Sequence, residues 1–135
     1  MSEEKAKILV IDDDPDFREA VTAILASGGY GVVAAAGPED GKAKILSERP
    51  DLVLLDIMMD SLFDGYALCH AVKTAPEFAS VRTTPIIFVS AVKDIAGARF
   101  GFQGAGEGLS EPDGYIDKPV KPADLLARIG SLLTK

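Results

Sequence analysis

The sequence has very little of several residue types, and each shortage excludes a class of protein. Its one cysteine, Cys69, excludes an internal disulfide and fits a reducing compartment. No stretch approaches the roughly 20 apolar residues of a membrane-spanning helix, and the polar residues 1–5 lack the apolar segment of a secretory signal. The net charge of −7 comes without a cluster of lysine or arginine, which argues against nucleic-acid binding. We therefore expect a cytoplasmic protein with no membrane insertion and no direct contact with nucleic acid.

Apolar residues are plentiful and form short runs that end in polar side chains. They make up 47% of the 135 residues, which indicates one domain, residues 1–135, with a core that begins at about residue 6. Short apolar runs are typical of strands buried on both faces of a parallel sheet, which carries its ligand sites at its carboxyl edge. Four runs end in polar residues: Ile8–Ile11 before Asp12 and Asp13, Leu52–Leu55 before Asp56, Ile86–Val89 before Ser90, and Tyr115–Ile116 before Asp117 and Lys118.

Helical segments alternate with these strands. The first is capped by Asp14, has Pro15 at its first position and repeats apolar residues from Phe17 at helical spacing until Gly28. Because parallel strands are joined by right-handed crossovers, alternating strands and helices predict a doubly wound α/β fold with helices on both faces. The other expected elements are a strand at Tyr30–Ala35, a helix from Gly37 to before Pro50 that buries Ala43, Ile45 and Leu46, a helix at Gly65–Thr74, a short helix within Val92–Phe100, a strand at Gly114–Asp117 and a helix from Pro122; the glycine-rich residues 101–108 match no element.

Four motifs follow one another along the chain. They are ILVIDDD at residues 8–14, DLVLLDIMM at residues 51–59 with a later DG, IIFVSA at residues 86–91 and YIDKP at residues 115–119. In this order and spacing they resemble the receiver domain of bacterial two-component response regulators, and the resemblance covers nearly the whole chain. It implies a flavodoxin-like (βα)5 fold whose five parallel strands have the order 2-1-3-4-5.

Three carboxylates are expected to lie together when the strands have this implied order. The first strand then lies about 4.8 Å from the third, which brings Asp12 and Asp13 within several ångströms of Asp56. Carboxylates about 5 Å apart repel by roughly 3 kcal/mol at an effective dielectric constant near 20, so three need a cation. Ligands that are all oxygen favour Mg²⁺ or Mn²⁺ over zinc. The resemblance implies that Asp13, Asp56 and the Met58 backbone carbonyl bind the metal directly, and that Asp12 helps mainly through water.

Asp56 is then the expected phosphoryl acceptor. A carboxylate can attack a phosphoryl group to form an aspartyl-phosphate, and the transfer depends mainly on positioning and charge neutralisation. Lys118 supplies a compact cation and Ser90 a hydroxyl donor for the phosphate oxygens. The resemblance implies that the donor is a phosphohistidine on a sensor histidine kinase or a phosphotransfer protein. It also implies that the domain is no enzyme for a separate substrate, because it catalyses only its own phosphorylation and dephosphorylation.

Phosphorylation is expected to switch a surface that binds a downstream protein. The resemblance implies that Ser90 moves toward the phosphate, that Tyr115 then turns inward, and that the peptide bond before Pro119 is cis, as few X–Pro bonds are. It leaves open whether the domain forms a homodimer. Three features depart from the family pattern: Asp60 stands where a proline is usual, the segment from Ser90 to Lys118 is longer than is common, and Met58 and Val92 stand where relatives carry polar residues.

Three alternatives share some of these features. A phosphatase of the haloacid dehalogenase type needs a second aspartate where this chain has Met58, and a flavodoxin needs a Ser/Thr/Gly-rich phosphate loop where this chain has residues 12–15. A receiver-like interaction module that works without phosphorylation is the third, and the complete set of aspartate, serine and lysine residues argues against it. His70 is expected to be structural, because it lies on a helix away from the strand ends.

Overall fold

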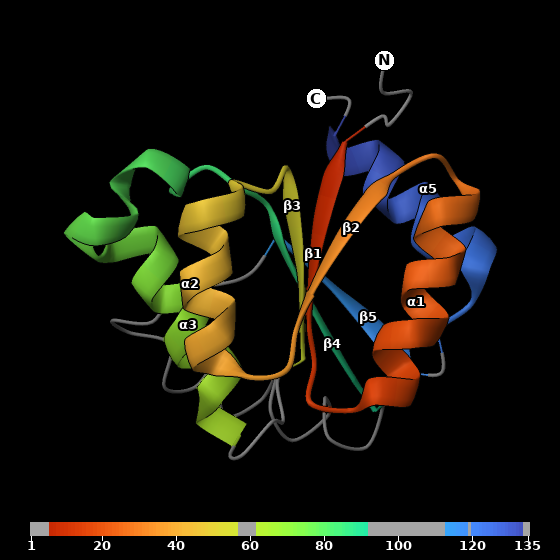
Figure 1. Ribbon diagram of the computed structural model, residues 1–135, viewed down its shortest axis with the longest axis horizontal. Coiled ribbons are helices and arrows are strands. Elements are labelled where there is room, and N and C mark those ends of the chain that lie inside the picture. The colour runs from red at the N-terminus through yellow and green to blue at the C-terminus, as the bar shows by residue number, and fades with distance from the viewer. Residues whose placement is uncertain (1–5, 57–61, 92–112, 119, 134–135) are drawn as a thin grey trace.

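Five parallel strands form one sheet in the order β2-β1-β3-β4-β5, which confirms the predicted topology. The computed structural model describes residues 6–56, 62–91, 113–118 and 120–133, and the side chains of residues 62–66 and 90–91 lie outside that description. All five strands run in the same direction, so their carboxyl ends meet at one edge of the sheet (Figure 1). The strands are β1 (Lys7–Ile11), β2 (Gly31–Ala35), β3 (Leu52–Asp56), β4 (Ile86–Ala91) and β5 (Gly114–Lys118).

Helices cover both faces of the sheet. On one face lie α1 (Pro15–Ser27) and α5 (Pro122–Leu133), and on the other α2 (Pro38–Glu48) and α3 (Leu62–Thr74) (Figure 1). A 3-10 helix, η1 (Pro76–Val81), follows α3. Across the described residues, none of the helices combines the length and apolarity that a membrane span requires.

The sheet separates two hydrophobic cores, and each strand supplies alternate residues to them. Leu9 and Ile11 of β1 pack on the side of α2 and α3, whereas Ile8 and Val10 pack on the side of α1 and α5. This alternation follows from the two-residue repeat of a strand. Every residue of β3 is buried, which is why its sequence is an unbroken apolar run up to its terminal aspartate.

Some predicted boundaries and core positions were wrong. Helix α3 begins at Leu62 rather than Gly65, because a glycine inside a helix costs only about 1 kcal/mol and does not end a 13-residue helix. Ala43 is exposed and Leu46 is 39% exposed. The buried positions of α2 are Gly41 and Ile45, which are four residues apart and so share one face. The predicted helix within 92–100 and the glycine-rich residues 101–108 lie outside the described residues.

Gly41 allows α2 to pack closely against the end of β1. A Cβ atom at this position would lie 2.7 Å from Ile11 Cδ1 and 3.2 Å from both Cγ atoms, and Ile11 is fully buried. Ile11 cannot turn away easily, because β-branched side chains have few rotamers. Gly130 in α5 differs, since the atom nearest to its added Cβ would be the Tyr30 hydroxyl oxygen at 4.0 Å.

We therefore expect opposite effects from the same substitution at the two glycines. Gly41→Ala is expected to lower the free energy of unfolding by about 1–2 kcal/mol, because overpacking outweighs the gain in helix propensity. Gly130→Ala is expected to raise it by about 0.5–1 kcal/mol. Urea unfolding of both variants measures the difference, and a stabilised Gly41→Ala protein would contradict the packing argument.

Asp113 joins three elements at the amino edge of the sheet. Its Oδ2 accepts hydrogen bonds from Ile86 N at 2.8 Å and Lys73 Nζ at 3.1 Å, and its own backbone N–H donates to Ile86 O at 2.7 Å. These contacts connect the start of β4 with the residue before β5 and with the last turn of α3. We call this arrangement the Asp113 clasp.

Cys69 is a buried thiol inside α3. Burial raises its pKa from the ordinary 9.0 to about 12, Lys73 acts in the opposite direction and Asp113 in the same one. We expect iodoacetamide at pH 8 to leave the folded protein unlabelled, because the reactive thiolate is almost absent, and to label the urea-unfolded chain.

Since the pKa of Cys69 is higher in the folded than in the unfolded chain, the contribution of this thiol to stability is complete below pH 9 and is lost as the pH rises toward 12. A fall in unfolding free energy over that range, smaller in Cys69→Ala, checks the sign.

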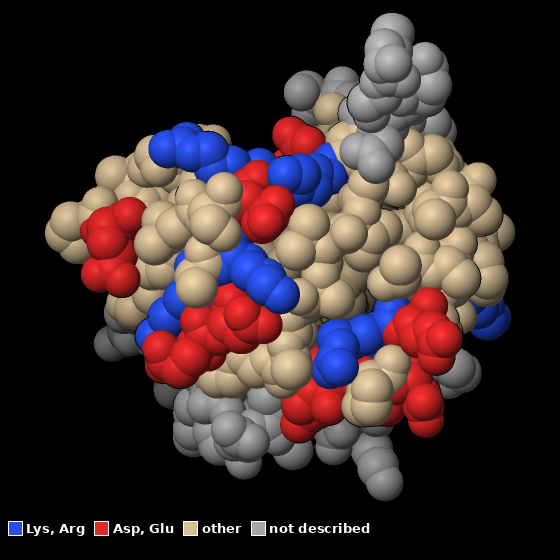
Figure 2. Space-filling view, viewed as in Figure 1, with Lys and Arg blue, Asp and Glu red and all other residues tan. Residues whose placement is uncertain are grey.

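Lysine and acidic side chains alternate on the surface of α2. Lys42 lies 3.8 Å from Glu39, and Lys44 lies 3.3 Å from Asp40. Pairs at this helical spacing contribute roughly 0.3–0.5 kcal/mol each. Figure 2 shows both signs of charge interspersed on this face of the molecule, so the face offers no extended basic surface of the kind that binds nucleic acid.

Candidate functional site

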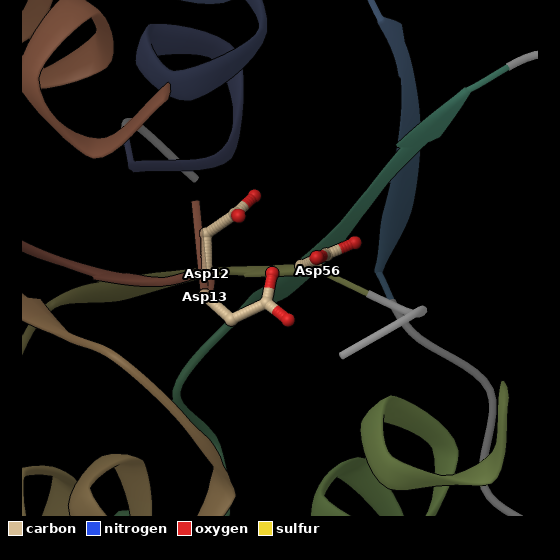
Figure 3. A group of neighbouring side chains, drawn as sticks. All are labelled: Asp12, Asp13 and Asp56. Carbon is tan, nitrogen blue, oxygen red and sulfur yellow. The ribbon is translucent and has the colours of Figure 1, made fainter. Parts of the chain in front are cut away.

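An acidic cluster lies at the carboxyl edge of the sheet, where β1 and β3 end side by side. Ile11 pairs with Leu55 in the parallel register, so Asp12 and Asp56 follow at the same level. One carboxylate oxygen from each of Asp12, Asp13 and Asp56 lies within 4.8 Å of the others. Figure 3 shows the Asp12 and Asp13 side chains leaving the end of β1 in different directions, with Asp56 beside them. The structure therefore brings together the three carboxylates that the sequence places at this edge.

Asp12 is held by hydrogen bonds at four atoms. Its backbone N–H donates to Ala35 O at 3.1 Å, and its backbone oxygen accepts from Arg18 Nη1 at 2.7 Å. Of its carboxylate oxygens, Oδ1 accepts from the Asp14 backbone N–H at 2.9 Å and Oδ2 from Lys118 Nζ at 3.1 Å. The residue is only 1% exposed, so its carboxylate is largely removed from water. These hydrogen bonds compensate for the lost hydration.

The three consecutive aspartates after β1 serve different purposes. Asp14 caps α1, because its Oδ1 accepts from the Asp16 backbone N–H at 3.0 Å and Pro15 occupies the first helical position. Asp13 is exposed, and its carboxylate has no hydrogen bond or ion pair within the described parts of the chain. Asp56, the last residue of β3, is 4% exposed. One exposed and two buried carboxylates thus face one another.

Lys118 reaches the acidic cluster from the far strand of the sheet. It is the last residue of β5 and pairs in register with Ala91 of β4. Its ammonium forms an ion pair of 3.1 Å with Asp12, and its side chain is 26% exposed. Even with Arg18 bound to the Asp12 backbone, three carboxylates against two cations leave an excess of negative charge at this edge. All the donor atoms of the three acids are oxygen, so the cluster fits a hard cation such as Mg²⁺.

The remaining predicted site residues are only partly described. Ser90 belongs to β4, where its backbone pairs with Asp117, but its side chain lies outside the described atoms. The Met58 carbonyl and the peptide bond at Pro119 also lie outside the described residues. Tyr115 is half-buried in β5, and its ring meets that of Phe88 edge to face, with centroids 5.8 Å apart at an interplanar angle of 82°.

Two residues of α1 contact the site without having been predicted there. The Phe17 ring lies against Lys118 Nζ, which is 4.3 Å from the ring centroid, and Arg18 binds the Asp12 backbone. Helical spacing assigned Phe17 only to the core, and nothing in the sequence pointed to Arg18. The helix cap could have indicated that first-turn residues lie near the site, because Asp14 and Pro15 fix the first turn of α1 directly beside Asp12.

Comparison with known proteins explains this combination of fold and acidic edge. The family model for the response regulator receiver domain matches residues 8–130. The chain belongs to the response regulator receiver domain family. A probable transcriptional regulator, ycf27 of Porphyridium aerugineum, is 37% identical over 133 residues, which are 98% of this chain and 50% of that protein. The receiver domain spans about half the length of the curated relatives it matches.

Solved receiver structures share the fold at nearly full length. A putative response regulator from Chloroflexus aurantiacus superposes with a TM-score of 0.80 at 29% identity, covering 96% of this chain and 98% of that one. Chemotaxis protein CheY4 of Vibrio cholerae superposes with a TM-score of 0.75 at 26% identity, covering 95% and 98%. The receiver fold predicted from the sequence is therefore confirmed.

Proposed function

We propose that this receiver domain accepts a phosphoryl group on Asp56 in a two-component phosphorelay. The observation that carries the proposal is the cluster of Asp12, Asp13 and Asp56 within 4.8 Å, with the Lys118 ammonium 3.1 Å from Asp12. A nucleophile, further acids and a cation at one strand edge are the parts that phosphoryl transfer to a carboxylate needs. The donor is a phosphohistidine on a sensor histidine kinase or a phosphotransfer protein.

The reaction moves one phosphoryl group between two side chains. An oxygen of the Asp56 carboxylate attacks the phosphorus and forms a P–O bond, while the P–N bond to the donor histidine breaks and its electron pair stays on the imidazole nitrogen. Lys118 pairs with the oxygens of the incoming group, because its flexible stem brings a compact positive charge to the cluster. The buried position of Asp56 limits the water that competes for the phosphorus.

We include a divalent cation, Mg²⁺ or Mn²⁺, in this proposal. The proposal is supported by the three carboxylate oxygens within 4.8 Å of one another, because an all-oxygen donor set is what a hard divalent cation prefers. Asp13 and Asp56 would hold it with the carbonyl of Met58, and Asp12 would help through water. When bound, the cation neutralises charge on the transferring group.

Phosphorylation is proposed to change what the domain binds. Ser90 and Tyr115 are the switch residues, and the proposal is supported by the position of Tyr115 on β5, with its ring against Phe88 at the edge of the core. The chain spans about half the length of relatives that are named as transcriptional regulators. We therefore propose the downstream target only as a class of partner. A protein that docks on the switched surface is the partner proposed.

The test is phosphorylation by acetyl phosphate, followed by intact-mass measurement. In the presence of Mg²⁺ we expect a gain of one phosphoryl unit, and with excess EDTA we expect none. Unchanged mass in both samples would favour the interaction module that works without phosphorylation. Equal gain in both would remove the cation from the proposal while leaving Asp56 chemistry in place.

A further inference from the structure

The Lys118 ammonium lies between a carboxylate and an aromatic ring. Asp12 Oδ2 is 3.1 Å from Lys118 Nζ, and the centroid of the Phe17 ring is 4.3 Å from the same nitrogen. The carboxylate comes from the residue after β1 and the ring from the first turn of α1, whereas the lysine comes from the end of β5. Two neighbouring segments near the start of the chain and one strand near its end therefore converge on one charged atom.

The ring adds a constraint that the ion pair alone does not supply. A lysine side chain has four rotatable bonds, and a carboxylate accepts its ammonium from many directions. An aromatic face attracts a cation only over the ring, so the two partners together confine the nitrogen to a small volume. Such confinement raises the occupancy of one lysine conformation by about twofold to thirtyfold relative to an apolar neighbour without a π face.

The ring itself is held in place by the start of α1. Phe17 is half-buried and packs against the core shared by α1 and α5. Asp14 caps the helix, and Arg18 binds the Asp12 backbone oxygen at 2.7 Å, which fixes the first turn beside the acidic cluster. The ring is therefore rigid relative to Asp12, as a group that orients another must be.

We infer that Phe17 is a positioning residue for phosphoryl transfer, because its ring holds the Lys118 ammonium at the acidic cluster. The inference rests on the proposed function, since Lys118 is the group that pairs with the incoming phosphoryl oxygens. It also assigns a second role to Phe17, because the spacing of apolar residues along α1 explains only its packing in the core. Leucine keeps the apolar contact and lacks a π face, so it separates the two roles.

The experiment compares Phe17→Leu, Phe17→Tyr and Phe17→Trp in the full chain. With acetyl phosphate and Mg²⁺, intact mass is expected to show phosphorylation of Phe17→Leu slowed by about twofold to thirtyfold. The two aromatic variants are expected to stay near the wild-type rate, since both keep a π face. A Phe17→Leu rate equal to wild type, or aromatic variants slowed as much as Phe17→Leu, would overturn the inference.

A second measurement does not depend on phosphorylation. In protein labelled with ¹³C-lysine, the NMR signal of the Lys118 ε-methylene group is the one that disappears in Lys118→Met. In wild type, the ring current of Phe17 is expected to shift this signal. In Phe17→Leu, the shift is expected to be lost. An unshifted wild-type signal would overturn the inference even if all variants were phosphorylated. A shifted signal in a wild-type protein that gains no phosphate would instead reject the proposed function, so the two failures are distinguishable.

Discussion

Replacement of Asp56 by asparagine is expected to abolish phosphate incorporation completely. The amide has nearly the shape of the carboxylate, so β3 and its register are kept, but its oxygen carries no negative charge to attack phosphorus. The substitution also removes one of the three oxygen ligands that the proposed cation would use. Intact mass after incubation with acetyl phosphate and Mg²⁺ measures the loss.

Asp16→Asn is the matched control for this variant. Asp16 is also an aspartate, yet it is exposed in the first turn of α1, so its replacement is expected to leave phosphate incorporation unchanged. Cooperative urea unfolding of Asp56→Asn is the check that the fold survives. Full incorporation in Asp56→Asn would assign the phosphate to another residue and refute the proposed acceptor.

Phe88→Ala is expected to destabilise the domain by about 3–5 kcal/mol. Phe88 is fully buried in β4, and its ring supports that of Tyr115 at a centroid distance of 5.8 Å. Removing the ring loses its transfer free energy and leaves a cavity that the rigid sheet cannot close. Because whole domains are stable by only about 5–15 kcal/mol, this loss is expected to be visible as a large shift of the urea midpoint.

Leu46→Ala is the control for truncation of a large apolar side chain. Leu46 is 39% exposed on α2, so its loss is expected to change stability by no more than about 0.5 kcal/mol. Phe88→Leu, which fills much of the space, is expected to fall between the two. A Phe88→Ala protein destabilised by less than about 1 kcal/mol would show that the core around β4 rearranges.

The central strands β1, β3 and β4 were predictable from the sequence because burial on both faces leaves an unbroken apolar run. β3 is the clearest case, since every residue from Leu52 to Leu55 is apolar and buried. Strand order was not predictable in this way, because no local pattern indicates which strands are neighbours. The resemblance to receiver domains supplied the order, and the structure has the same order. The inward face of α2 was misjudged, since apolar residues such as Leu46 are tolerated at the surface and Gly41 gives no hydrophobic signal.

The acids of the site were predictable because they follow directly after buried strands. Asp12, Asp13 and Asp56 needed only the rule that parallel strands end at one edge, together with the neighbouring positions of β1 and β3. The ring of Phe17 was not predictable as a partner of Lys118, because their contact depends on how α1 is tilted against β5. That tilt is a product of tertiary packing, which a periodic pattern in one segment does not encode.

The Asp113 clasp fixes the start of β5 independently of the length of the chain between β4 and β5. Because hydrogen bonds to Ile86 set where β5 begins, the ladder from Ile87 and Gly114 to Ala91 and Lys118 is fixed from its far end. The lysine therefore keeps its place however many residues separate the two strands along the chain. Insertions or deletions among residues 92–112 are therefore expected to leave the Lys118–Asp12 ion pair in place.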